Sequence, residues 1–135
     1  MKIIVCLDHK NGMAFCKKRQ SFDKVVCERI LQLCGGKRLY MNGYSKKLFD
    51  GIVGDVIVDE DFLDRAGKED YCFAENVDVT HYIAEADEII LMRWNRVYPA
   101  DLRFPAQQLS GWKKVDTTQF PGNSHECITQ EVYRR

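Results

Sequence analysis

The chain has 135 residues, enough for one hydrophobic core but too few for two ordinary domains. Apolar residues make up 45% and charged residues 30%, which is typical of a globular protein and excludes a disordered chain. Lys and Arg together number 20, as do Asp and Glu, so the zero net charge excludes a general attraction to nucleic acid or anionic membranes.

The first part of the chain predicts a strand, a loop and a helix. Residues 2–7 form a short apolar run, which is typical of a buried strand, and residues 9–21 are polar and predict a loop. From Ser21 onward, apolar residues recur with the period of a helix. We expect Ser21 to be the N-cap, Asp23 to lie in the first turn and Gly35 to end the helix.

The rest of the chain alternates short strands with short helices and then ends in strands. Strands are predicted at 38–41, 55–59, 70–74, 88–98, 112–120 and 125–133, helices at 45–49 (capped by Ser45) and near 78–85, and an acidic loop at 60–69. This order predicts an α/β sheet with an antiparallel C-terminal edge. No repeat or linker interrupts the chain, so we expect one domain over residues 1–135.

The cysteines and the N-terminus indicate a cytoplasmic protein. The six cysteines are scattered, with no CxxC pair, and we expect them to be reduced and mostly structural. Only Cys16, beside Lys17, has neighbours that favour a thiolate. The apolar run at 2–7 is too short for a signal peptide or a membrane-spanning helix.

The C-terminal half carries a family resemblance. The segment ADEIILMRWNRVYPADLRFP (86–105), followed by Trp112 and a terminal VYRR, is similar to the closing strands of the dihydrofolate reductase family. Residues 2–13 and 30–41 resemble that family's first strand and the end of its first helix with the next strand. The resemblance implies a single dihydrofolate-reductase-like domain with a mostly parallel central sheet and helices on its faces. The short segment between 55–59 and 70–74 implies that about one strand and one helix have been trimmed.

The same resemblance implies that reductase chemistry has been lost. The family's catalytic carboxylate aligns with Val26 and its threonine partner with Met92, while Asp23 lies almost one turn earlier than Val26. The family's glycine turn reads Ala74-Glu75-Asn76 here, and Glu75 adds a charge that would repel phosphates by about 1 kcal/mol. We therefore expect no catalytic residues and no cofactor, and NADPH binding is disfavoured.

A residual site would use side chains from both halves of the expected cleft. Its predicted ligand-binding residues are Arg19, Val26, Tyr44, Ser45, Lys46 and Met92. The sequence favours a ligand-binding or protein-interaction module that lacks reductase activity, with a nucleotide-like ligand or a protein as its partner. The alternative is an oxidoreductase or other enzyme that binds a nucleotide-like or heterocyclic small molecule in the cleft.

Other function classes have weaker support. His9, His81 and His125 are far apart and are interpreted as surface or turn residues. A metal-dependent hydrolase of the ribonuclease Z type is disfavoured, because it needs clustered His and Asp ligands, and no metal site is expected. The basic run 17–19, between Phe15 and Phe22, is interpreted as a solvated loop rather than a nucleic-acid contact.

Overall fold

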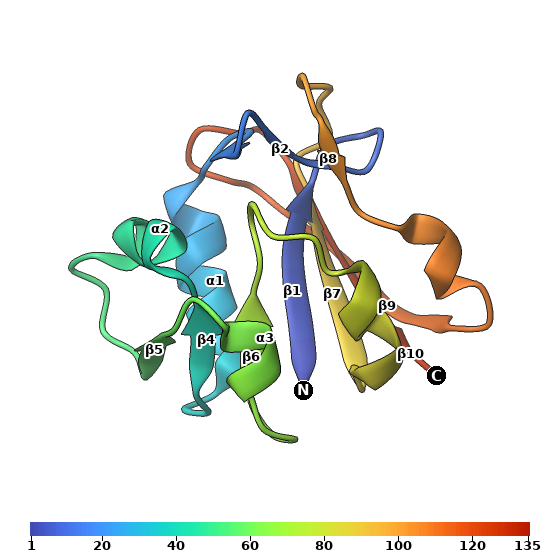
Figure 1. Cartoon of the computed structure of the whole chain (residues 1–135). Helices are drawn as coiled ribbons and strands as arrows, with labels where there is room; N and C mark the ends of the chain where they lie inside the picture. The colour runs from blue at the N-terminus through green and yellow to red at the C-terminus, as the bar shows by residue number, and fades with distance from the viewer.

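The computed structural model describes residues 1–135 and places a seven-stranded sheet between two layers of helices, with a three-stranded sheet beyond the end of β1 (Figure 1). The strands are β1 (Lys2–Leu7), β2 (Gly12–Phe15), β3 (Lys18–Arg19), β4 (Leu39–Met41), β5 (Val56–Val58), β6 (Tyr71–Phe73), β7 (Glu88–Arg93), β8 (Leu102–Arg103), β9 (Lys113–Phe120) and β10 (Ile128–Arg134). The helices are α1 (Lys24–Cys34), α2 (Gly43–Lys46) and α3 (Phe62–Arg65), and the 3-10 helices are η1 (Lys47–Phe49), η2 (Thr80–Glu85) and η3 (Ala106–Leu109). None of the helices combines the length and apolarity needed to cross a membrane.

The strand order of the main sheet is β5-β4-β6-β1-β7-β10-β9. Its first five strands pair in parallel, and β10 runs antiparallel to both β7 and β9. The predicted parallel sheet with an antiparallel C-terminal edge is therefore confirmed. Central parallel strands are covered on both faces, which is why 2–7 reads as an unbroken apolar run rather than an alternating one.

Two hydrophobic cores lie on the two faces of this sheet. On one face, Ile4 and Met92 pack with Ile30 of α1, and all three side chains are fully buried. On the other face, Ile3 packs with Phe62 of α3 and with residues of η2. Successive residues of β1 thus serve opposite cores, as the alternation of a strand requires.

The two helix caps predicted at serines are wrong. Helix α1 is capped by Asp23, whose backbone is extended and whose Oδ1 accepts a hydrogen bond from the Val25 N–H at 2.9 Å. Helix α2 is capped by Asn42, whose Oδ1 accepts from the N–H of Ser45 at 3.0 Å. In both helices the N-cap is an Asp or Asn whose side chain accepts a hydrogen bond from a backbone N–H two or three residues later. The two serines instead bond to side chains elsewhere, Ser21 to His125 and Ser45 to Glu75.

Several predicted loops contain short elements. The predicted loop at 9–21 holds β2 and β3, and the acidic loop at 60–69 holds α3. The strand predicted at 88–98 ends at Arg93, because the chain turns at Asn95, which adopts a left-handed φ of 60°. The strand predicted at 125–133 starts at Ile128, and the turn segment before β9 contains β8 and η3.

Candidate functional site

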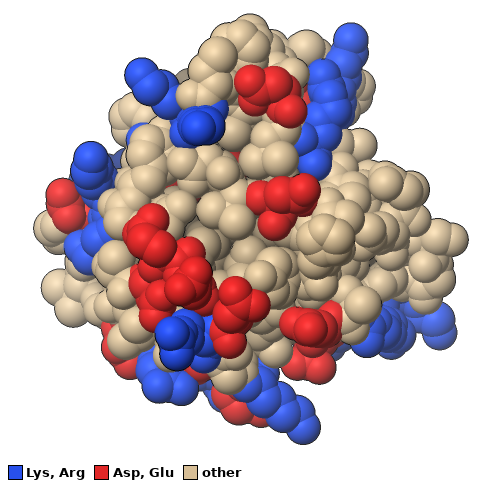
Figure 2. Space-filling model, in the orientation of Figure 1, with Lys and Arg blue, Asp and Glu red and all other residues tan.

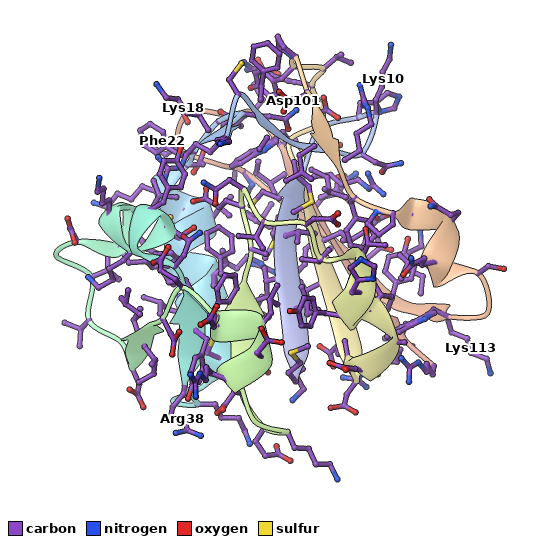
Figure 3. The ribbon with its side chains drawn as sticks, in the orientation of Figure 1. Lys10, Lys18, Phe22, Arg38, Asp101 and Lys113 are labelled. Carbon is purple, nitrogen blue, oxygen red and sulfur yellow. The ribbon has the colours of Figure 1, made fainter.

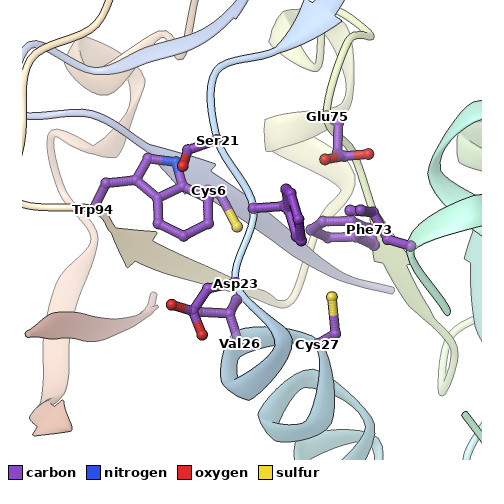
Figure 4. A pocket seen from close by; sticks show the side chains of 10 residues that line it. Cys6, Ser21, Asp23, Val26, Cys27, Phe73, Glu75 and Trp94 are labelled. Atoms are coloured by element: carbon purple, nitrogen blue, oxygen red, sulfur yellow. The ribbon is translucent and has the colours of Figure 1, made fainter. Parts of the chain in front are cut away.

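The candidate site is a small cavity at the carboxyl ends of the adjacent strands β1, β6 and β7. Cys6 of β1, Phe73 of β6 and Trp94, directly after β7, line it, and the start of α1 closes it (Figure 4). Ligands of open α/β sheets bind at this end of the strands. The accessible volume is only about 10 Å³, which is about the space that one water molecule needs.

The two apolar residues predicted to replace a polar pair lie in one core. Val26 lines the cavity and is 2% exposed, whereas Met92 is fully buried and is not among the lining residues. Both belong to the core on the α1 face of the sheet, together with Trp94. This part of the expected cleft is therefore filled by side chains.

Three other predicted residues form a polar cluster around Glu75. The Arg19 guanidinium donates to both carboxylate oxygens of Glu75, at 2.9 and 3.1 Å, and the Ser45 hydroxyl donates to Oε1 at 2.8 Å. The same guanidinium lies 4.1 Å from the centroid of the Tyr44 ring. The Tyr44 hydroxyl accepts from the backbone N–H of Arg19 at 2.9 Å. We call Arg19, Tyr44, Ser45 and Glu75 the Glu75 cluster; it joins β3, α2 and the turn after β6.

The Glu75 cluster changes two expectations. Glu75 does not present a bare negative charge, because Arg19 pairs with it and only 5% of its side chain is exposed. Simple repulsion of a phosphate is therefore the wrong description of this turn. Lys46, predicted to belong to the site, makes its ion pair with Asp50 at 3.3 Å instead.

A carboxylate also reaches the cavity: that of Asp23, almost one turn before the matched position Val26. Asp23 is buried and lines the cavity opposite Glu75 (Figure 4). Burial acts to raise the pKa of Asp23, but hydrogen bonds from the Asn123 N–H, the His125 ring and further backbone N–H groups outweigh it. The pKa of Asp23 is therefore held well below its ordinary value, and the carboxylate stays ionised.

His125 does lie in a turn, between β9 and β10, but it is buried, so the surface alternative of its interpretation is wrong. Its Nδ1 lies 3.0 Å from Asp23 Oδ2, and its Nε2 lies 3.0 Å from the Ser21 hydroxyl. The indole of Trp94 stacks on the imidazole with the ring centroids 4.6 Å apart. No local pattern in the sequence predicts this contact, because the turn between β9 and β10 brings His125 to residues about a hundred positions earlier.

The cysteines and acidic residues form no further centre. All six cysteines are free, and burial raises the pKa values of Cys27, Cys34 and Cys72 to about 12, so these thiols stay protonated. The acidic side chains of the predicted loop gather near α3 on the face seen in Figure 2. Nowhere do three or more His, Cys, Asp or Glu residues come together in a way that could hold a metal ion.

Comparison with known proteins identifies the fold. No family model matches the sequence, and no curated protein matches it. A dihydrofolate reductase from Enterococcus faecalis, solved in complex with NADP(H) and RAB-propyl, matches the structure with a TM-score of 0.72 and 13% identity. The match covers 99% of this chain and 95% of that one. At this identity the likeness concerns the fold alone, and the chain has a dihydrofolate-reductase-like fold.

Proposed function

We propose that this chain is a non-reductase protein of dihydrofolate-reductase-like fold that works as a protein-interaction module through a groove between α1 and η1. The observation that carries the proposal is the difference in volume between the cavity at the strand ends and this groove. The cavity at the strand ends holds about 10 Å³, whereas the groove beside it has an accessible volume of about 520 Å³. The fold's usual ligand position is filled, and the neighbouring surface is open.

The cofactor side of the cleft does not fit a dinucleotide. The similar reductase was solved with NADP(H), but here the polar groups after β6 are used within the chain. Glu75 pairs with Arg19, and the Asn76 amide donates to the Lys17 carbonyl at 2.9 Å and accepts from Asn42 at 3.0 Å. A dinucleotide would have to break these contacts and meet a buried carboxylate where a glycine turn would offer backbone N–H groups.

On the substrate side, Asp23 is not suited to be the proton donor of a reductase. Asp23 is ionised, and both of its oxygens already accept hydrogen bonds from the start of α1 and from the turn before β10. A general acid needs a pKa near the working pH and a proton that it can donate to the substrate. Asp23 meets neither condition, and the position that matches the family's carboxylate, three residues later, is Val26.

The groove suits a partner protein that presents an apolar side chain between carboxylates. Its apolar lining includes Phe22, which is 59% exposed and projects beside the start of α1 (Figure 3). Lys24 and Lys47 are exposed on its rim, while the one acidic residue of the lining, Asp50, is paired with Lys46. Small-molecule pockets have a few convergent buried polar groups, and this lining has none. A peptide segment with an apolar anchor between acidic residues fits better.

The first test separates this proposal from the enzyme alternative. The protein is mixed with NADPH and dihydrofolate, NADPH absorbance is followed, and thermal unfolding is measured with each ligand alone. We expect no turnover and no stabilisation. A ligand present at 100 times its Kd would stabilise the protein by about 2.7 kcal/mol, which such a scan detects readily. Turnover, or stabilisation by NADPH, by a pterin or by another nucleotide, would overturn the proposal.

The second test concerns the groove itself. Displayed peptides with one large apolar residue between Asp or Glu residues are selected on the protein, and the affinity of the best peptide is measured. Reversing the charges in Lys24→Glu/Lys47→Glu should weaken binding about tenfold or more. The matched control is Lys113→Glu, in an exposed lysine on β9, which should leave the affinity unchanged. Failure to select any peptide, or equal effects of the two variants, would refute the groove.

A further inference from the structure

Three polar side chains beside the cavity form a linear array outside the Glu75 cluster. The Ser21 hydroxyl lies 3.0 Å from His125 Nε2, and His125 Nδ1 lies 3.0 Å from Asp23 Oδ2. His125 and Asp23 are buried, and Ser21 is half-buried and lines the cavity. We call this the Ser21–His125–Asp23 array.

The contacts of Asp23 fix the proton positions in the array. An ionised carboxylate accepts hydrogen bonds only, so the facing His125 Nδ1 carries the proton. In the neutral imidazole Nε2 is then the acceptor, and it faces the hydroxyl of Ser21 at 3.0 Å and that of Tyr98 at 3.3 Å, so Ser21 is the nearer donor. Hydrogen bonds from the backbone N–H groups of Asn123 and Ser124 hold the carboxylate, at 2.9 and 2.8 Å. The stacked Trp94 ring fixes the plane of the imidazole.

This geometry is that of an activated serine nucleophile. We propose that Ser21 and His125 are catalytic residues for the hydrolysis of acetyl esters, with Asp23 as the positioning residue. This activity is separate from the proposed interaction through the groove. A nucleophile and base within hydrogen-bond reach, with the base oriented by a third group, define this reaction class.

The cavity sets the size of the acyl group. Ser21 lies beside the apolar side chains of Cys6, Val26 and Trp94, in a space of about 10 Å³. That volume is about the room of one water molecule, so a methyl group fits and a longer chain does not. Acetyl esters are therefore the substrate class, and butyryl or octanoyl esters should be poor substrates.

The reaction balances without a cofactor. Ser21 Oγ bonds to the ester carbonyl carbon as its proton moves to His125 Nε2, and the π electrons move to the carbonyl oxygen. The electron pair on the carbonyl oxygen then re-forms the C=O bond, the bond to the alcohol oxygen breaks, and that oxygen takes the proton from Nε2. The products of this first half-reaction are the free alcohol and acetyl-Ser21. Water repeats the sequence on acetyl-Ser21, which releases acetic acid and restores the serine.

The test uses covalent labelling as well as turnover. A fluorophosphonate probe forms a bond from Ser21 Oγ to phosphorus with loss of HF, and mass spectrometry of the digested protein locates the label. We expect the label on Ser21, and p-nitrophenyl acetate hydrolysis above that of p-nitrophenyl butyrate. Ser21→Ala should abolish both, and His125→Gln should slow both by at least about 100-fold. Ser110→Ala, in an exposed serine after η3, is the matched control and should behave as the native protein.

A pH profile separates catalysis from a structural role of the array. The labelling rate of the native protein should level off at high pH, because the array supplies its own base, whereas in His125→Gln it should only follow hydroxide. Asp23→Asn should lower the rate and change this profile in protein shown by circular dichroism to be folded. Absence of labelling, a label on Ser124 or Tyr98, or folded Ser21→Ala that labels like the native protein would overturn the proposal.

Discussion

The Glu75 cluster can be tested by removing each charge of its ion pair alone and then both together. Glu75 and Arg19 expose only 5% and 22% of their side chains, so neither is well solvated. In Arg19→Met the carboxylate keeps only the Ser45 hydroxyl, and breaking a buried pair in this way costs about 3–5 kcal/mol of unfolding free energy. In Glu75→Gln the partly exposed guanidinium can turn to water, so the expected loss is smaller, about 1–3 kcal/mol.

The double variant Arg19→Met/Glu75→Gln removes both charges, so its loss should be smaller than the sum of the single losses. We expect a coupling energy of about 2 kcal/mol, from urea unfolding followed by circular dichroism. The matched control is the Lys37–Glu69 pair, which has the same 2.9 Å separation but exposes 48% and 67% of its side chains. Water screens this pair, so its cycle should show no measurable coupling. Equal coupling in the two cycles would refute the reasoning that burial makes the Arg19–Glu75 pair the stronger one.

Three further predictions concern Asp23, the second carboxylate at the cavity. Asp23→Ala should cost about 3 kcal/mol of unfolding free energy, because it leaves backbone N–H groups of α1 and of the turn before β10 without acceptors. Asp61→Ala, at an N-cap whose side chain makes no capping bond, should change it little in the same urea titration. The pKa of Asp23 is lower in the folded protein than in the unfolded chain. Its contribution to the free energy of unfolding should therefore be complete above its unfolded pKa of about 4 and should be lost as the pH falls further. The difference in unfolding free energy between native protein and Asp23→Ala, measured over this pH range, checks this. Gly122→Ala should lower the thermal midpoint, because a Cβ there would lie 2.6 Å from Asp23 Oδ2 and 2.9 Å from the His125 carbonyl oxygen.

Elements with a strong local pattern could be predicted from the sequence. The apolar run of β1 and the helical stripe of α1 both follow from the spacing of neighbouring residues, and the structure places both as expected. The small sheet could not be predicted, because β2 pairs with β8 through contacts such as Gly12 with Arg103, about ninety residues apart. Two-residue strands like β3 have no periodicity of their own, so only the fold brings them together.

The candidate site was predicted in part. Arg19, Tyr44 and Ser45 do come together, but the residue that gathers them, Glu75, was expected only to repel phosphate. The choice between Ser21 and Asp23 as the helix cap also depends on distant groups. Asp23 is held by donors from the turn before β10, a contact that no local propensity reports.

The two carboxylates at the cavity explain how a cleft of this fold can close without becoming purely apolar. A buried carboxylate is stable only when each oxygen has partners, and those partners must come from nearby backbone or side chains. Glu75 draws its partners from β3 and α2, and Asp23 draws its partners from α1 and the turn before β10. Glu75 therefore fastens β3 and α2 to the turn after β6, and Asp23 fastens the start of α1 to the turn before β10. A ligand that needed the Glu75 carboxylate would have to break these contacts first, whereas Asp23 keeps its partners while it holds His125 in place.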